Sequence, residues 1–275
     1  MTSQKVELSS TLKHEIVKQK TMNEPFHSST DAIVHDFEAL IRYVAGEKIA
    51  LTPKQKLVPL RHVKKVMEHF QVKESHEHII GDVAYKKRDE SEYPRFSFLD
   101  LLAIGGGFLK ITGRNLLAKG PNWETFFAVR PEERGFHLFC ALRYSFNSEN
   151  WLMCGGDFGK QLEEKSEMIW SRMLHWSDGK VIDWRFWAQE IIRACGLRWN
   201  SIDQTHAEGL AIWGLGYCFL KPLEYFGLLV EAEKEGDDFA RLQSFRLNRV
   251  GCDYFGRLFT KVDKSISGIS PFSLN

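Results

Sequence analysis

Three short runs rich in alternating apolar residues recur along the chain, and in each a Thr or an Asn follows the apolar part. The runs read IALTPKQKL, LKITGRNLL and FRLNRVGCD, and they align on Thr52, Thr112 and Asn248. Alternation with period two is typical of a half-buried strand, and a Thr or Asn after it can cap a following helix. The distances between the runs are unequal, which excludes a solenoid of fixed repeat. We therefore predict one unit of helix, strand and capped helix that is used three times.

Helical periodicity surrounds the first run. Apolar residues from Ile33 to Val44 recur at spacings of three and four, which predicts a helix from near Asp31 to Gly46. Pro59 suits the first position of a helix and predicts the start of PLRHVKKVMEHF. We place the first unit at residues 31–90, after a polar N-terminal segment of residues 1–30.

Helices are also predicted before and after the other two runs. FLDLLAI predicts a helix that ends at the glycines after it, and Thr112 is expected to cap a basic stretch that turns helical and continues through WETFFAV. Near the C-terminus, EYFGLLVEAEKEGDD predicts a helix, SFRLN a strand, and RVGCDYFGRLF a helix capped by Asn248. These units occupy residues 91–135 and 206–265, and residues 266–275 form a tail.

A Trp-rich helical region, residues 136–205, separates the second and third units. Trp184, Trp187, Ile191 and Ala194 recur at spacings of three and four, so we interpret them as one buried helix face. With twenty Phe and eight Trp, the chain has many large side chains to bury between helices. The predicted fold class is mainly α with short β-wings, in which tandem winged-helix-like units surround a helical middle region.

The repeated unit resembles the last third of winged helix-turn-helix domains, including regulators of the multiple-antibiotic-resistance type. There, a strand ending in Leu-Thr leads through two spacer residues, and often a Gly, into the final helix. Leu247, Asn248 and Gly251 follow this order with Asn in place of Thr. In the first two copies, Gln55 and Asn115 stand where that Gly would be.

The first two copies also resemble the winged repeats of an uncharacterised prokaryotic family found on plasmids and in mobile elements. The residues that carry this likeness are Leu51, Thr52, Lys56, Leu57 and Pro59. The resemblance to winged helix-turn-helix regulators implies a DNA-binding or transcription-regulating protein.

Basic residues lie beside the first two predicted wings. On a helix that begins near Pro59, Arg61, Lys64 and Lys65 share one face, opposite the apolar side chains. Lys and Arg near a wing commonly contact phosphates and release counterions on binding. The candidate nucleic-acid-binding residues are Lys54, Lys56, Arg61, Lys64, Lys65, Lys110, Arg114 and Lys119. The expected partner is double-stranded DNA.

A second hypothesis is a protein-interaction scaffold or a subunit of a larger assembly that does not contact nucleic acid. A formal net charge of only +1 argues against a protein that coats nucleic acid over its whole surface. Winged modules also serve as interaction and dimerisation units. A protein partner or a homo-oligomer therefore remains an alternative to DNA.

Known catalytic and cofactor motifs give no support for an enzyme. Asp157-Phe158-Gly159 spells a kinase tripeptide, but the other kinase motifs do not occur and we predict a turn there. His76 and His78 do not have the HExxH spacing of zinc proteases, and the glycine-rich stretches are not phosphate loops. We therefore predict a non-enzymatic protein with no metal and no cofactor.

The cysteines and the N-terminal sequence indicate the cellular compartment in which we expect the protein. The five Cys have no C-x-x-C spacing, which favours reduced thiols. The N-terminus lacks the apolar core of a signal peptide, and the most apolar stretch, residues 210–230, is interrupted by Gly, Lys, Pro and Glu. The expected location is the cytoplasm, with no membrane association.

Overall fold

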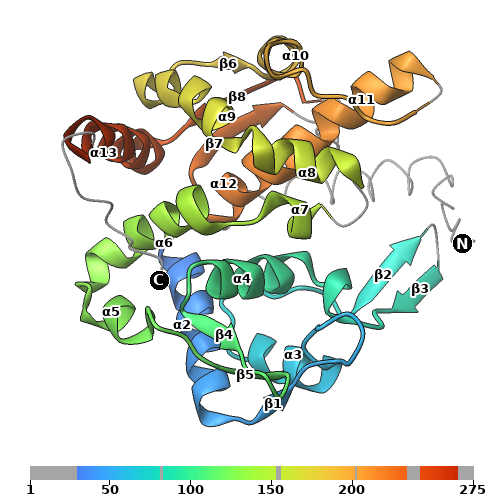
Figure 1. The fold of residues 1–275 in the computed structure, drawn as a ribbon, viewed down its shortest axis with the longest axis vertical. Coiled ribbons are helices and arrows are strands. Elements are labelled where there is room, and N and C mark those ends of the chain that lie inside the picture. Colours follow the sequence, from blue (N-terminus) through green and yellow to red (C-terminus); the bar gives the residue numbers. More distant parts are fainter. Residues whose placement is uncertain (1–29, 81–82, 153–155, 202, 234–241, 266–275) are drawn as a thin grey trace, which may run out of the picture.

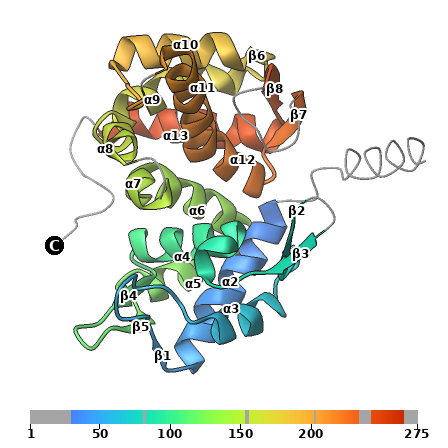
Figure 2. The same ribbon diagram turned by 90° about the vertical axis from the view of Figure 1, so that its right-hand side faces the viewer.

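Helices make up most of the described chain, and short strands join them in small antiparallel sheets. The computed structural model in Figure 1 describes residues 30–80, 83–152, 156–201, 203–233 and 242–265. Its elements form two halves that lie one above the other, with α6 and α7 near their junction (Figures 1 and 2). The mainly helical class with short strands is confirmed.

The N-terminal half alternates helices with short strands. Its elements are α2 (Thr30–Gly46), β1 (Ile49–Ala50), α3 (Leu60–Met67), β2 (Glu77–Ile80), β3 (Val83–Lys86), the short 3-10 helix η1 (Glu90–Glu92), α4 (Pro94–Gly105), β4 (Leu109–Ile111), β5 (Leu116–Lys119), α5 (Trp123–Ala128) and α6 (Pro131–Ser145). β5 lies between β1 and β4 and is antiparallel to both, and β2 pairs only with β3 among the described strands.

The C-terminal half has a similar order of helices and strands. Its elements are α7 (Ser148–Trp151), α8 (Asp157–Glu164), α9 (Ser166–Arg172), the 3-10 helix η2 (Leu174–Asp178), β6 (Ile182–Asp183), α10 (Trp184–Cys195), α11 (Gln204–Leu215), the π-helix η3 (Gly216–Leu220), α12 (Lys221–Tyr225), β7 (Leu229–Glu233), β8 (Ser244–Leu247) and α13 (Arg249–Ser265). Here too the last strand, β8, lies between the other two.

The sheets cross the expected boundaries between units. β1, from the range 31–90, pairs with β5, from the range 91–135. β6, from the range 136–205, pairs with β8, from the range 206–265. The first two expected units thus share one sheet, and the Trp-rich region shares another with the third. The polar segment and the tail lie outside the described residues, except that α2 begins at Thr30.

The second run, LKITGRNLL, does not lead into a helix as expected. Residues after Thr112 turn back, and Leu116–Lys119 pairs with Leu109–Ile111 as the second strand of a hairpin. Asn115 has a positive φ of 59°, a conformation that reverses the chain and is foreign to a right-handed helix. The prediction that Thr112 caps a helix is therefore wrong.

The third run has the cap that its sequence predicts. Asn248 Oδ1 accepts a hydrogen bond from the Gly251 amide at 2.8 Å, at the start of α13. The helix expected before it is only partly present, because α12 ends at Tyr225 and Leu229–Glu233 forms the strand β7. The ladder with β8 satisfies the backbone groups that a helix would have used.

Two smaller expectations are also corrected. The tripeptide at Asp157 begins α8 and is not an isolated turn. On α10, Trp184 and Ile191 are buried and Trp187 packs partly against the core, as predicted, but Ala194 is exposed.

Aromatic side chains join the two halves. Phe139 of α6 lies with its ring centroid 5.9 Å from Phe226 and 5.3 Å from Phe255. Phe98 of α4 lies 5.2 Å from the ring of Tyr225. All five rings belong to one continuous hydrophobic core. Large rings in such a core bury much apolar area, so the two halves share one hydrophobic core.

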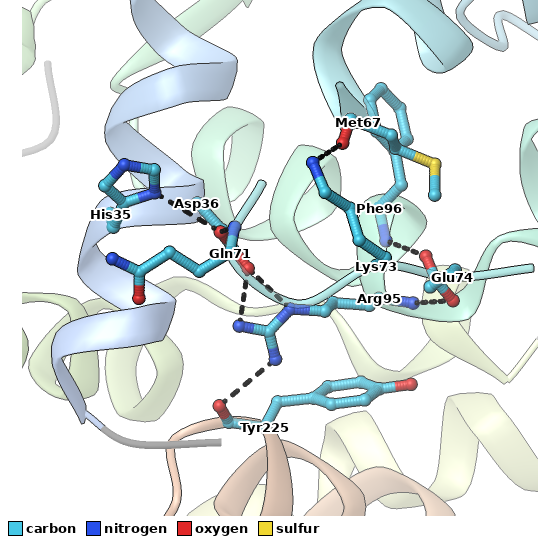
Figure 3. Close-up of polar contacts among 9 residues, drawn as sticks. All are labelled: His35, Asp36, Met67, Gln71, Lys73, Glu74, Arg95, Phe96 and Tyr225. Carbon is cyan, nitrogen blue, oxygen red and sulfur yellow. Dashed lines mark hydrogen bonds and ion pairs between the residues drawn. The ribbon is translucent and has the colours of Figure 1, made fainter. Parts of the chain in front are cut away.

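A buried ion pair fixes three helices within this core. Asp36 of α2 is fully buried, and its Oδ2 accepts a hydrogen bond from Arg95 Nε at 2.9 Å and pairs with Arg95 Nη2 at 2.8 Å (Figure 3). Asp36 Oδ1 also accepts from the Gln71 amide at 2.5 Å. Arg95 Nη1 donates to the Tyr225 carbonyl at 3.4 Å, across to the other half. One ion pair thus connects α2, α4 and α12.

A second carboxylate accepts hydrogen bonds from the backbone at the start of α4, which is the end of the helix that carries Arg95. Glu74 Oε1 and Oε2 accept from the amides of Arg95 and Phe96, each at 3.1 Å (Figure 3). The first amides of a helix have no partner within it, so the preceding loop supplies one. Burial raises the pKa of Glu74, and the two backbone hydrogen bonds oppose that shift.

We predict that Arg95→Met lowers the free energy of unfolding by about 3–5 kcal/mol, because it leaves the Asp36 charge buried without its partner. The double variant Asp36→Ala with Arg95→Met is expected to lose less than the sum of the two single variants. Urea denaturation of all four proteins gives the coupling energy. If the losses in the free energy of unfolding were additive, the two side chains would not be coupled.

Candidate nucleic-acid interface

All eight basic residues that the sequence singled out are exposed. Lys54 and Lys56 lie in the turn after β1, Arg61, Lys64 and Lys65 on α3, Lys110 on β4, Arg114 at the tip of the β4–β5 hairpin, and Lys119 at the end of β5. The sheet of β1, β5 and β4 and helix α3 occupy the end of the N-terminal half that is remote from the C-terminal half (Figures 1 and 2).

The turn after β1 is closed by Thr52. Its amide donates to the Leu57 carbonyl at 2.9 Å, and its hydroxyl accepts from the Leu57 amide at 3.0 Å. Lys56, the residue before that Leu, donates from its amide to the Thr52 carbonyl at 3.1 Å and has a positive φ of 60°. Thr52 therefore closes a loop and does not cap α3, which begins after Pro59.

The turn between β4 and β5 has the same hydrogen bonds. The Thr112 amide donates to the Leu116 carbonyl at 2.9 Å, and the Thr112 hydroxyl accepts from the Leu116 amide at 3.2 Å. Asn115, which precedes the Leu, donates from its amide to the Thr112 carbonyl at 2.8 Å. The first two runs are thus similar in sequence and form the same kind of turn. The turn in the first run is one residue longer.

Asn115 holds the two turns side by side. Its side-chain amide donates to the Leu51 carbonyl at 3.0 Å, and its own carbonyl accepts from the Leu51 amide at 3.0 Å. We refer to the residues 52–57 and 112–116 together as the paired turns. They bring Lys54, Lys56 and Arg114 to one end of the sheet on short loops with fixed backbones.

Arg61 on α3 is positioned by a buried histidine. Arg61 Nε donates to His62 Nε2 at 3.3 Å, and His62 Nδ1 lies 3.0 Å from the Tyr43 hydroxyl. Since Nε2 accepts, the proton of the neutral imidazole is on Nδ1, which donates to Tyr43. Burial, with a further contribution from the Arg61 charge, lowers the pKa of His62, so the imidazole is neutral at pH 7.

Lys110 and Lys119 are not brought to the tips of the paired turns. Both lie near the base of the hairpin, where Lys119 packs its ammonium over the Trp123 ring, 4.8 Å from the centroid. An open groove runs between the hairpin and the end of α2, and Lys119 lines it together with Lys48. Lys48 is not among the candidates from the sequence, because it lies outside the basic run of residues 54–65.

The helix that precedes the hairpin is not available to a ligand. Of α4, the side chains from Arg95 to Asp100 are buried, as are Leu102 and Ala103. In the other half, the corresponding helical run ends in η3 and α12, whose side chains are also largely buried. A helix buried on all sides cannot enter a DNA groove.

No group of three or more His, Cys, Asp or Glu residues within the described ranges is arranged to hold a metal ion. Among the same residues, no helix is long and apolar enough to cross a membrane. Comparison with models of protein families, with curated proteins and with solved structures finds no match for this chain.

We predict that Asn115→Ala destabilises the protein more than Asn115→Gly. Both variants lose the side-chain hydrogen bond, which contributes about 0.5–1.5 kcal/mol. Only Ala adds the cost of a left-handed backbone, about 1–2 kcal/mol, because Gly adopts positive φ freely. Urea denaturation midpoints test the order, and equal losses would contradict the role of the φ of 59°.

Proposed function

We propose that this protein is a non-enzymatic DNA-binding protein that grips the phosphate backbone of duplex DNA through the paired turns. The observation that carries the proposal is the side-by-side placement of Lys54, Lys56 and Arg114 on two hydrogen-bonded loops. Fixed loops lose little conformational entropy when they bind, so exposed cations on them are efficient phosphate contacts.

The order of elements supports this proposal. The N-terminal half contains the series α2, β1, α3, α4, β4, β5 and α5, with the β2–β3 hairpin and η1 inserted before α4. The C-terminal half contains the series η2, β6, α10, α11, β7, β8 and α13, with η3 and α12 inserted after α11. In both series the last strand is central in its sheet. Apart from these insertions, the series is similar to that of a winged-helix unit, which the resemblance in the sequence implies, so the proposal treats the halves as two such units. The loop Thr112–Leu116 is then the wing of the first unit, with Arg114 at its tip.

The burial of α4 restricts the mode of binding. In helix-turn-helix proteins a helix in the major groove reads the base edges. Because the corresponding helix here is in the core, the proposed contacts are with phosphates, and Arg61, Lys64 and Lys65 on the exposed face of α3 extend them. Phosphate contacts depend strongly on salt and carry little sequence information.

We predict that the triple variant Lys54→Glu, Lys56→Glu, Arg114→Glu loses most of its affinity for duplex DNA. The slope of log K against log salt is expected to fall by about 0.9 for each phosphate that the variant no longer neutralises. Fluorescence anisotropy with two duplexes of unrelated sequence measures both the affinity and the sequence preference.

The matched control is Lys160→Glu, Lys165→Glu, Arg172→Glu, which makes the same charge change at exposed positions of α8 and α9 and between them. The control is expected to keep the larger part of the affinity. An equal loss in both triple variants, or no binding by the wild-type protein at low salt, would contradict the proposal.

A second candidate function, protein interaction, is favoured by the hairpin of β2 and β3. Ile79, Val83 and Tyr85 on this hairpin are 77%, 51% and 48% exposed. The hairpin projects from the side of the N-terminal half, and both of its edges lack a further strand among the described residues (Figure 1). Exposed edges pair readily with other strands, and a second copy presents the same edge. The candidate is a homodimer formed by this hairpin.

For this candidate, light scattering of the full chain is expected to give the mass of a dimer, and Ile79→Lys the mass of a monomer, because a charge in the joined sheet opposes association. Val250→Lys, at an exposed apolar position of α13, is the control and is expected to remain dimeric. A monomeric wild-type protein would rule out the hairpin dimer and would leave the DNA proposal unaffected.

A further inference from the structure

A small polar cavity lies near the junction of the two halves. Its walls come from α6 of the N-terminal half and from α7, α8, α9 and η3 of the C-terminal half. The centres of water-sized molecules have a volume of about 60 Å³ in it. That volume holds about four to six waters, which is close to the number of heavy atoms in the smallest amino acids. Sites for small molecules often lie at such junctions.

A buried guanidinium forms one side of the cavity. The side chain of Arg143 is only 7% exposed, and its guanidinium carbon lies 5.1 Å from the ring centroid of Tyr144 and 5.4 Å from that of Trp170. Its Nη2 donates to Glu167 Oε2. No other hydrogen bond of this guanidinium is formed within the described residues, so Nε and Nη1 are available as donors to a ligand. Such donors on a buried cation recognise a carboxylate.

A carboxylate and two hydroxyls form the other polar side. Glu163 Oε2 accepts a hydrogen bond from the Ser148 amide at 2.9 Å, which holds the carboxylate in place at the cavity wall. Glu163 Oε1 makes no hydrogen bond to a described residue, so it can accept from an ammonium group. Ser148 and Ser166 add hydroxyls to the lining.

The charges of the lining decide which class of ligand fits. One positive group, Arg143, and two negative groups, Glu163 and Glu167, line the cavity. A simple anion would lie close to two carboxylates, and a simple cation would lie close to the guanidinium. Like charges at such short range oppose binding, above all where water is scarce. A molecule that carries both a carboxylate and an ammonium group meets an opposite charge on each side.

An irregular helix supplies part of the wall. In η3 the Lys221 amide bonds to the Gly216 carbonyl, five residues earlier, which is the bond of a π-helix. Short π-helical segments are rare and are frequent at functional sites. This one brings Cys218 and Phe219 to the cavity. The ring of Phe219 gives the cavity an apolar wall beside its charged groups.

We propose that this cavity binds a small α-amino acid, such as glycine or alanine, with its carboxylate on Arg143 and its ammonium group on Glu163. Near pH 7 such an amino acid is a zwitterion, so it matches both sides of the cavity. The small volume restricts the side chain of the ligand to a hydrogen atom or a methyl group. The inference is independent of DNA binding, because none of the proposed phosphate contacts lines this cavity.

The first experiment is isothermal titration calorimetry of the full-length wild-type protein with glycine, L-alanine, acetate and methylamine. Acetate and methylamine each carry only one of the two charges. We expect one of the amino acids to bind at least about tenfold more tightly than either single-charge probe, because each lost charge-assisted hydrogen bond costs that much or more. No binding of glycine and L-alanine at millimolar concentration, or acetate binding as tightly as they do, would overturn the inference.

The second experiment repeats the titration with Glu163→Gln and Arg143→Lys. Gln keeps an acceptor for the Ser148 amide but removes the charge, and Lys keeps the charge but loses the planar set of donors. Each variant is expected to bind the amino acid roughly ten- to a hundredfold more weakly. Wild-type affinity in both variants would overturn the assigned contacts.

The matched controls are Glu164→Gln and Arg172→Lys, which make the same changes at exposed positions outside the cavity lining. Both are expected to bind the amino acid as the wild-type protein does. Urea midpoints show whether each variant is folded. If Arg143→Lys does not fold, Glu163→Gln and the wild-type titration still decide the inference. A tenfold loss in the controls as well would overturn the assignment of the site to this cavity.

Discussion

The ion pair between Asp36 and Arg95 is the constraint on which the arrangement of the two halves depends. A charge in the core must keep its partner, because an unpaired buried charge costs several kcal/mol. Arg95 meets Asp36 on α2 and also the backbone of Tyr225 on α12, so one side chain fixes elements from both halves. Glu74 holds the end of α4 from which Arg95 extends.

The position of α4 has a consequence for every hypothesis about function. With Arg95 anchored at one end and Phe98 packed against Tyr225, this helix lies in the interior between the halves. A fold that uses such a helix to read DNA would have to expose it. The paired turns, the face of α3 and the β2–β3 hairpin are exposed, and these are the surfaces on which the proposed functions rest.

The helices were predictable where an apolar stripe was long. The stripe from Ile33 to Val44 gives α2 almost to the residue, and Asn248 caps α13 as its sequence indicates. The predictions were wrong where a short segment could form either a helix or a strand. Residues Leu116–Lys119 and Leu229–Glu233 are strands because neighbouring strands accept their hydrogen bonds, and those neighbours are distant in sequence or follow a turn.

The sequence alone determined which side chains are candidates for contact, since runs of Lys and Arg without acids remain exposed in nearly any fold. It also indicated that the first two runs are alike, whereas the structure shows that their likeness is a turn closed by Thr52 or Thr112 and not a helix cap. Only the tertiary structure decided that the two turns lie together. The pairing of β1 with β5 is a long-range choice made by the whole core, because its partners are far apart in the sequence.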